Sequence, residues 1–290
     1  MHLLKGKSGQ ARKLRTRSGK TGAAILAVSA QKGGVGKTTS AVHVAWDLAS
    51  HYHRKTLLID LDAQGHVGTH LAKYARIETT KNLGNVLMER HGNIADIVVP
   101  TGVKDLHLTC SDKNLHQIEI QLNGKIGKEM ILRRALEHAR ENFDVIVLDC
   151  PPNLGNLTVS ALVACDSVLV PTDLSRLSLE GVSDILHTLE TIDDTFGNAP
   201  FLEGVLLTRV DRRSKRYNEE VRETLRALVG EKLLDTEIPA QSSVARAQAE
   251  GTTVFDLDPS GAAAIAYEKL TQKLTQSLGI RTLSSNRRSA

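Results

Sequence analysis

The chain of 290 residues is poor in aromatic side chains and in cysteine, and both shortages limit what it can be. Aromatic residues make up 3% of the chain, which predicts an aliphatic core and leaves few rings for stacking on nucleic-acid bases. The three cysteines, Cys110, Cys150 and Cys165, are scattered and odd in number, which argues against a disulfide framework and favours a reducing compartment. No apolar run approaches the length of a membrane span, and no secretory apolar segment is visible near the start.

Acidic residues are missing before Ala23, whereas basic residues are frequent there. The seven basic positions are Lys5, Lys7, Arg12, Lys13, Arg15, Arg17 and Lys20. Since the formal net charge of the whole chain is +4, subtracting these seven charges leaves a body near −3. We expect residues 1–22 to form a basic, disordered arm. A solubilising tail, a transit peptide and an arm that seeks nucleic-acid phosphates all share this composition.

Short runs rich in Val, Ile and Leu alternate with helical patterns in the rest of the chain. The expected strands cover 23–30, 55–62, 144–152, 166–172, 201–210 and 233–239, and the expected helices cover 37–50, 126–143, 178–192, 217–228 and 262–278. Continuous apolar runs are typical of strands buried on both faces. The alternation predicts an α/β fold with a mostly parallel, twisted sheet flanked by helices on both faces. Ligands in such folds bind beyond the carboxyl ends of the strands.

A glycine-rich segment, "SAQKGGVGKTT" at residues 29–39, links the first expected strand to the first expected helix. This is the context of a phosphate-binding loop, whose main-chain N–H groups cradle a phosphate at a helix N-terminus. In such a loop Lys37 would contact the β- and γ-phosphates and Thr38 would ligate Mg²⁺. Lys32 is a second lysine, which phosphate binding alone does not require.

Three aspartates follow expected strands, where they are available to a magnesium ion. Asp60 and Asp62 lie in "LLIDLDAQG", and Asp149 ends the apolar run "VIVLDCPP". A carboxylate at the end of a buried strand needs an ion pair or a metal to offset its burial. A threonine hydroxyl, one or two carboxylates and water form the expected ligand set of Mg²⁺. Asp62, just beyond its strand, is placed to hold a water molecule in line with a γ-phosphate.

The motifs "QKGGVGKTT", "LLIDLDAQG", "VIVLDCPP", "LSLEGV" and "EIP", in this order and spacing, resemble the ParA/MinD family of deviant Walker A ATPases, and more narrowly its ParA/Soj partition branch. The resemblance runs from about residue 23 to 278. It implies one P-loop NTPase domain over 23–279 and a polar tail over 280–290. It also implies a role for the second lysine: Lys32 would reach across an ATP-sandwiched homodimer to the phosphates bound by the other subunit.

The resemblance carries further site roles onto matching positions. It implies catalytic roles for Lys32, Lys37 and Asp62, and metal binding by Thr38, Asp60 and Asp149. The implied nucleotide-binding positions are Gly33, Gly34, Val35, Gly36, Lys37, Thr38, Thr39, Thr208, Arg209 and Pro239, the last three near the adenine. Residues 173–176, "DLSR", depart from the acidic-aromatic run common at this point of the family.

The resemblance also implies ATP and Mg²⁺ as ligands, DNA as a non-specific partner of the dimer, and a ParB-like centromere-binding protein that stimulates hydrolysis. The segment "DRRSKR" at 211–216 is basic, and it supplies the expected DNA contacts together with one later arginine. These are Arg212, Arg213, Lys215, Arg216 and Arg246. The alternative for the segment is a solvated loop paired with Glu219 and Glu220.

Two other functions are compatible with parts of the sequence. A MinD-type membrane-cycling ATPase requires a basic amphipathic helix at the C-terminus, whereas this chain ends in "TLSSNRRSA". A reductase resembling the nitrogenase iron protein requires cysteines around a shared iron–sulfur cluster, and Cys150 and Cys165 do not lie in the expected setting. We therefore expect a cytoplasmic, nucleoid-associated ATPase without stable membrane association. The stripe Ile265, Leu270, Leu274 and Leu278 predicts that the last helix docks on the core.

Overall fold

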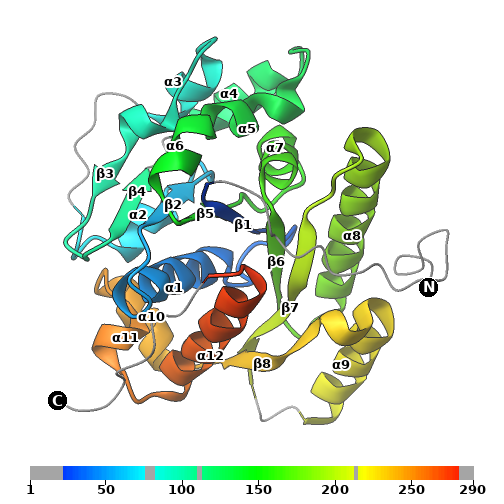
Figure 1. The fold of residues 1–290 in the computed structure, drawn as a ribbon. Coiled ribbons are helices and arrows are strands. Elements are labelled where there is room, and N and C mark those ends of the chain that lie inside the picture. The colour runs from blue at the N-terminus through cyan, green and yellow to red at the C-terminus, as the bar shows by residue number, and fades with distance from the viewer. Residues whose placement is uncertain (1–21, 76–81, 110–112, 212–214, 281–290) are drawn as a thin grey trace.

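A central sheet with helices on both faces forms the body of the protein (Figure 1). The computed structural model describes residues 22–75, 82–109, 113–211 and 215–280. The predicted arm, apart from Gly22, and the predicted tail, apart from Ile280, lie outside these ranges, as does Cys110. Within the described residues, no helix is long and apolar enough to cross a membrane.

Eight strands form the sheet in the order β3-β4-β2-β5-β1-β6-β7-β8. Their bounds are β1 (Ala24–Val28), β2 (Thr56–Asp60), β3 (Val99–Pro100), β4 (Leu106–Thr109), β5 (Val145–Asp149), β6 (Ser167–Thr172), β7 (Phe201–Val210) and β8 (Leu233–Pro239). All neighbouring pairs are parallel except β3 and β4. The six predicted strands are confirmed, and the mostly parallel sheet with them.

The helices connect these strands and cover both faces of the sheet (Figure 1). The α-helices are α1 (Lys37–Ser50), α2 (His66–His70), α3 (Leu83–Met88), α4 (Leu115–Leu122), α5 (Ile131–Ala135), α6 (Glu137–Asn142), α7 (Asn156–Ala164), α8 (Arg176–Phe196), α9 (Lys215–Val229), α10 (Ser242–Ala249), α11 (Val254–Leu257) and α12 (Ala262–Ser277). Three short 3₁₀ helices are η1 (Ile94–Ile97), η2 (Lys128–Met130) and η3 (Gly230–Lys232).

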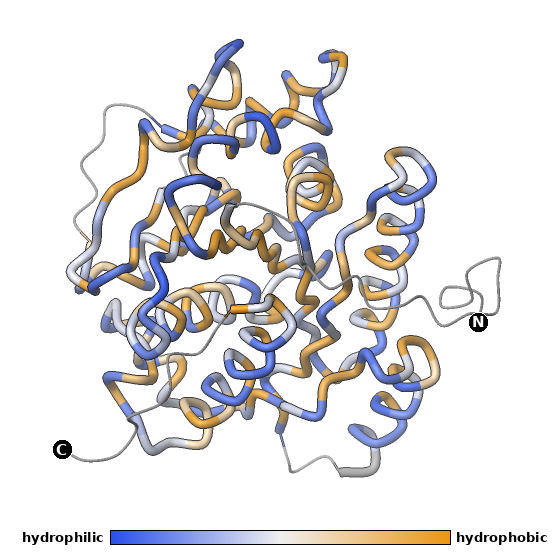
Figure 2. Tube along the Cα trace, in the orientation of Figure 1, coloured by the Kyte–Doolittle hydropathy of each residue, from blue (hydrophilic) through white to orange (hydrophobic). Residues whose placement is uncertain are grey.

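Alternate residues of each central strand enter two separate cores, because side chains of a strand point to opposite faces. Ile25 and Ala27 of β1 face the core under α3 to α9, whereas Leu26 and Val28 face the core under α1, α2 and α10 to α12. Figure 2 shows hydrophobic residues concentrated along the central strands. Burial on both faces explains why these strands appear in the sequence as continuous apolar runs.

Two helix predictions need correction. The single helix expected over 126–143 is divided into η2, α5 and α6. Gly127 has a left-handed conformation with φ 69°, and the Leu132 N–H donates to the Ser160 side chain at 3.1 Å, so the first turn departs from a regular helix. In α12 the buried stripe includes Tyr267, Leu270 and Leu274, as its docking on the core requires, but Ile265 faces outward and is 43% exposed.

The register of the strands brings the predicted site residues to one edge of the sheet. Asp149 of β5 is paired in register with Asp60 of β2 on one side and with Val28 of β1 on the other. The glycine-rich segment follows β1 directly. The loop and two of the three predicted aspartates therefore meet at the carboxyl ends of three adjacent strands.

Candidate functional site: a phosphate-binding loop and its acidic edge

The loop between β1 and α1 has the backbone of an anion-binding turn. Gly34 and Gly36 adopt left-handed conformations with φ values of 75° and 80°, which residues other than glycine rarely adopt. Gly36 is the N-cap of α1, and no side chain caps the helix. The first turn of α1 contains no acidic residue, so its N-terminus offers uncompensated N–H groups to an anion.

Lys37 lies inside this loop. Its Nζ donates to the carbonyl oxygen of Lys32 at 3.0 Å, and the residue is only 7% exposed. Burial lowers the pKa of the Lys37 ammonium, and the nearby carboxylates of Asp149 and Asp62 partly oppose this effect. The geometry confines a positive charge to the concave side of the loop, where a phosphate group would sit.

Lys32 points out of the loop instead of into it. Its Nζ contacts Asp173 Oδ2 at 2.7 Å and donates to Ser175 Oγ at 3.0 Å. Both partners lie in the connection between β6 and α8, within the segment that departs from the family pattern. Sequence reasoning did not assign Asp173 a role, although an acid directly after a strand at this edge of the sheet is the same signal that identified Asp60 and Asp149.

Asp60 organises the loop that carries Asp62. Its two carboxyl oxygens accept hydrogen bonds from the main-chain N–H groups of Asp62 at 3.0 Å and Val67 at 3.2 Å. Burial, followed by the charge of Asp149, raises the pKa of Asp60 well above its ordinary value. Asp62 itself is half-buried and accepts from the Gln64 N–H at 3.0 Å. The pinned loop thus presents Asp62 beside the phosphate-binding turn.

Asp149 supplies the observation that fits a metal ion. It is fully buried, and neither carboxyl oxygen accepts a hydrogen bond from any residue in the described parts of the chain. Burial raises the pKa of Asp149 to about 7. The nearby Thr38 hydroxyl, whose placement does not meet the geometry of a hydrogen bond to the carboxylate, and the Lys37 ammonium lower this pKa by smaller amounts. Buried carboxylates without partners are costly, and a hard divalent cation is the usual compensation.

Thr38, Asp60 and Asp149 therefore form a suitable oxygen donor set for Mg²⁺ together with phosphate oxygens. The described residues contain no cluster of three His, Cys, Asp or Glu side chains that would hold a metal by itself.

Two of the residues expected near the adenine contact the phosphate loop. The Thr208 hydroxyl, which is buried, lies within hydrogen-bond distance of the carbonyl oxygens of Val35 (2.7 Å) and Thr172 (3.1 Å). Arg209 donates from Nη1 to the Gly34 carbonyl oxygen at 2.8 Å. Its backbone is left-handed with φ 52°, and the register between β7 and β8 shifts at this point. The end of β7 thus holds the loop through two hydrogen bonds, one from Thr208 to Val35 and one from Arg209 to Gly34.

Thr39 and Pro239 complete the predicted nucleotide set. Thr39 is half-buried in the first turn of α1, and its carbonyl oxygen is 2.7 Å from His43 Nδ1. Pro239 ends β8 beside Val210 and is partly exposed at the same edge of the sheet.

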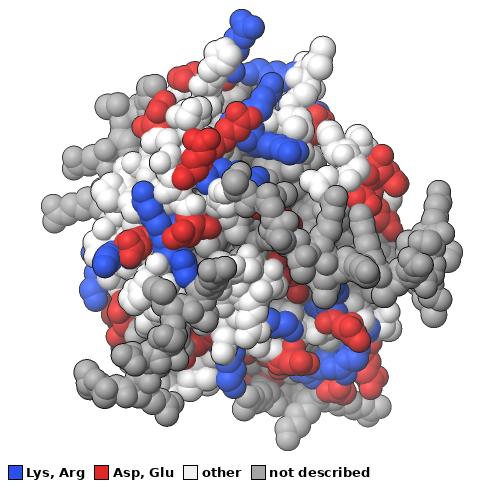
Figure 3. Space-filling view, in the orientation of Figure 1, with Lys and Arg blue, Asp and Glu red and all other residues white. Residues whose placement is uncertain are grey.

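Only part of the predicted basic surface lies in the described residues. Arg212 and Arg213 lie outside them, and Lys215 and Arg216 begin α9. The Arg246 side chain on α10 is 66% exposed, with Glu250 at 3.8 Å. Glu219 pairs with Arg222 at 2.8 Å, within α9. Figure 3 shows basic and acidic side chains intermixed over this region of α9.

The two described cysteines are buried free thiols, Cys150 at 1% and Cys165 at 6% exposure. Burial raises the pKa of both thiols. Ligands of an iron–sulfur cluster shared between subunits must reach the surface as thiolates, so these two residues do not support the reductase alternative.

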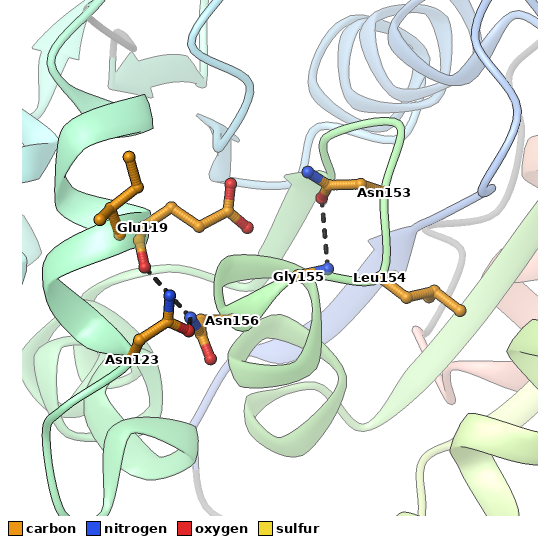
Figure 4. A pocket seen from close by; sticks show the side chains of 7 residues that line it. Glu119, Asn123, Asn153, Leu154, Gly155 and Asn156 are labelled. Atoms are coloured by element: carbon orange, nitrogen blue, oxygen red, sulfur yellow. Dashed lines mark hydrogen bonds between the residues drawn. The ribbon is translucent and has the colours of Figure 1, made fainter.

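A separate cavity of about 350 Å³ lies between α4 and the segment after β5. Glu119 and Asn123 line one side, and Asn153 and Asn156 line the other (Figure 4). The Asn156 amide donates to Asn123 Oδ1 at 2.8 Å and to the Glu119 carbonyl oxygen at 3.1 Å. No residue of the phosphate loop lines this cavity, so it is distinct from the phosphate-binding site.

The fold and site define a P-loop nucleotide-binding protein, and comparison with known proteins gives its family. A family model described as an AAA domain matches residues 23–201. The chain is 33% identical over 250 residues to the sporulation initiation inhibitor protein Soj of Bacillus subtilis, covering 86% of this chain and 97% of Soj. It is 36% identical over 252 residues to the chromosome partitioning protein ParA of Caulobacter vibrioides, covering 86% and 93%.

Among solved structures, cobyrinic acid a,c-diamide synthase from Mycobacterium smegmatis, with a bound ATP analog and magnesium, is similar with a TM-score of 0.73 and 28% identity. The match covers 90% of this chain and 98% of that one. The chain belongs to the ParA/Soj family and is an ATPase. The predicted family, fold class and enzyme class are confirmed.

Proposed function

We propose that this protein is a DNA-positioning ATPase in which ATP and Mg²⁺ drive formation of a sandwich dimer that binds DNA without sequence preference. The observation that carries the proposal is the different direction of the two loop lysines. Lys37 lies within its own loop, whereas the Lys32 ammonium leaves the loop and ends on the surface near α8. A lysine that turns away from its own phosphate site is placed to serve the site of a second subunit.

The remaining site residues divide the chemistry of hydrolysis among them. Lys37 and the main-chain N–H groups of residues 33–36 bind the β- and γ-phosphates, and Thr38, Asp60 and Asp149 hold the metal. Mg²⁺, when bound, neutralises charge on the phosphate oxygens. Asp62, fixed by the loop that Asp60 pins, orients the attacking water. Lys32 of each subunit adds positive charge at the other subunit's γ-phosphate, as an arginine finger does.

Dimer formation couples this chemistry to DNA. The expected contacts are Arg212, Arg213, Lys215, Arg216 and the exposed Arg246. Basic side chains without aromatic partners suit phosphate contacts rather than base readout. Two copies of a weak surface bind one polymer more tightly than either copy alone, so DNA affinity follows the nucleotide state.

A ParB-like protein is the proposed partner that stimulates hydrolysis and releases the dimer from the nucleoid. The Caulobacter relative is a chromosome partitioning protein, and similarity over 93% of its length supports the same class of role here. The apolar stripe of α12 packs into the core and is therefore not available to a membrane surface. We therefore favour DNA over a membrane as the surface on which this ATPase cycles.

The substitution Lys32→Ala tests the proposal. We expect the variant to bind nucleotide as a monomer with wild-type affinity, and to lose both ATP-dependent dimerisation and hydrolysis. Multi-angle light scattering with Mg²⁺ and a slowly hydrolysed ATP analogue measures the dimer fraction. Equal dimer fractions in wild type and variant would refute the role of Lys32 in trans. Parallel co-sedimentation with duplex DNA and with anionic vesicles separates the DNA cycle from the membrane cycle.

A further inference from the structure

The ammonium of Lys32 is bound within its own subunit by a small polar cluster at the start of α8. Asp173 Oδ2 lies 2.7 Å from Lys32 Nζ, and Ser175 Oγ lies 3.0 Å from it. The other carboxyl oxygen, Asp173 Oδ1, accepts from Ser175 Oγ at 2.7 Å and from Ser178 Oγ. Asp173 therefore has donors on both oxygens, and its orientation toward Lys32 is fixed.

This ion pair is stronger than an ordinary surface pair. The side chains of Lys32 and Asp173 are 32% and 23% exposed, so solvent screens them only in part. Burial alone would raise the pKa of Asp173, but hydrogen bonds from Lys32, Ser178 and Ser175 outweigh it and the pKa is lowered. A charge-assisted pair of this kind holds a long side chain in one direction.

Among the described residues, Asp173 is the negatively charged group that contacts the Lys32 ammonium, and Ser175 adds a neutral acceptor. Ser175 is the N-cap of α8, whose first turn contains no acidic residue, so the positive end of a 21-residue helix dipole faces the Lys32 ammonium. Gly181 on the same helix lies close to the loop, since a Cβ added at this position would be 3.6 Å from the Gln31 Cβ. Asp173 is thus the charged group that retains Lys32 beside α8, and without it the ammonium keeps only the neutral Ser175 hydroxyl as a partner there among the described residues.

We propose that Asp173, held by Ser175 and Ser178, is a positioning residue that latches Lys32 in cis and must release it before the ATP dimer forms. This inference rests on the proposed function, since it assumes that Lys32 acts on the other subunit. The lysine has one ammonium, and binding to Asp173 competes with binding to phosphates across an interface. The latch keeps the resting protein monomeric and raises the nucleotide concentration at which it dimerises.

The substitution Asp173→Asn removes the charge of the latch and one of its two acceptor oxygens, and keeps the size of the side chain. Each dimer opens two latches, and loss of a charge-assisted contact is worth on the order of tenfold for each. We therefore expect the dimer dissociation constant with Mg²⁺ and a slowly hydrolysed ATP analogue to fall by about 100-fold. The affinity of the monomer for ADP should not change. Light scattering and sedimentation velocity measure the first, and titration calorimetry the second.

Matched variants separate the latch from general effects of charge or folding. Asp184→Asn makes the same change at an exposed position on the same helix and should leave dimerisation unchanged. Ser175→Ala leaves the Asp173 charge but removes one of its donors, and should give an intermediate shift. In the Lys32→Ala background, Asp173→Asn should have no effect. Thermal unfolding of each variant confirms that the fold is retained.

The outcomes distinguish failure of the latch from failure of the proposed function. If wild type dimerises with the analogue and Asp173→Asn dimerises equally or less well, the latch is wrong and the dimer switch stands. If neither protein dimerises at any nucleotide concentration, the proposed function fails and the latch fails with it. Dimerisation of Asp173→Asn alone would support both, and would indicate a latch that a partner must open.

Discussion

The Lys37 ammonium donates a hydrogen bond to the main-chain carbonyl oxygen of Lys32 at 3.0 Å, so the two lysines of the phosphate loop are in direct contact. Their side chains nevertheless differ in environment. Lys37 is 7% exposed, inside the loop, whereas Lys32 reaches Asp173 outside it. In the proposed function, Lys37 binds phosphate within its own subunit and Lys32 acts on the other subunit.

The first prediction concerns the buried lysine. Lys37→Met should lower the affinity for ATP by at least about 100-fold, equivalent to about 2.7 kcal/mol, because the charge inside the loop is lost. It should not lower the stability of the nucleotide-free protein, because burial already disfavours this ammonium. Fluorescent-nucleotide titration and thermal unfolding measure the two effects. Retained ATP binding would contradict the assignment, as would a large loss of stability without nucleotide.

The second prediction concerns Asp62. Asp62→Ala should reduce hydrolysis by about 100-fold or more, since orientation of the attacking water is lost, while ATP binding remains. The expected product is a long-lived ATP dimer, which size-exclusion chromatography with bound-nucleotide analysis would detect. Asp235→Ala, at an exposed position on β8, provides a control that should behave as wild type. Rapid turnover by the Asp62 variant would remove this residue from its assigned role.

The third prediction concerns Thr208, which holds the loop through a main-chain carbonyl. Thr208→Val keeps the shape of the side chain but leaves the carbonyl oxygens of Val35 and Thr172 without this donor. We expect a loss of about 1–2 kcal/mol in the free energy of unfolding and a several-fold weaker affinity for nucleotide. Denaturant unfolding and calorimetry measure these effects. Unchanged values for both would show that the loop does not depend on the contact.

The fourth prediction concerns pH. Burial raises the pKa of Asp149 from 3.8 to about 7, so the folded protein binds a proton more tightly than the unfolded chain. The contribution of this carboxyl to the stability of the metal-free protein should therefore be greatest at or below about pH 4. It should be lost as the pH rises from about 4 to 7. The full effect for one carboxyl is roughly 4 kcal/mol, and the buried Asp60 beside it acts in the same direction.

Asp149→Asn is the matching variant, because it removes the ionisation and keeps the shape. In the absence of Mg²⁺ and nucleotide it should be more stable than wild type at pH 8, with a flatter dependence on pH between 4 and 7. Thermal unfolding across a pH series measures this. If the stability of the wild type rose between pH 4 and 7 and that of Asp149→Asn showed the same pH dependence, the claim that burial raises the pKa of Asp149 would be contradicted.

Much of the phosphate site was predictable because local sequence determines it. A buried strand, a glycine-rich turn and a helix follow one another directly, and Gly34 and Gly36 have the left-handed backbone that their type predicts. Asp60 and Asp149 end apolar strands, and parallel pairing necessarily brings such ends together. The main strands were predicted for the same reason, since burial on both faces gives continuous apolar runs.

Contacts between distant segments were not predictable. Thr208 reaches the loop because β7 pairs with β6. Its hydroxyl meets the carbonyl oxygen of Thr172, which lies 36 residues earlier in the chain. The partnership of Lys32 with Asp173 spans 141 residues. The helix expected over 126–143 has suitable periodicity, but Gly127 and the Ser160 hydroxyl divide it. Tertiary contacts override local preference at such points.

The central claim is that ATP switches DNA binding, and the most direct test is binding to duplex DNA of arbitrary sequence with Mg²⁺-ATP, with Mg²⁺-ADP and without nucleotide, over a salt series. We predict binding only with ATP, with an affinity that falls by at least about tenfold between 50 and 200 mM salt, because the contacts are to phosphates. Equal binding in all three nucleotide states, or none in any, would contradict the account.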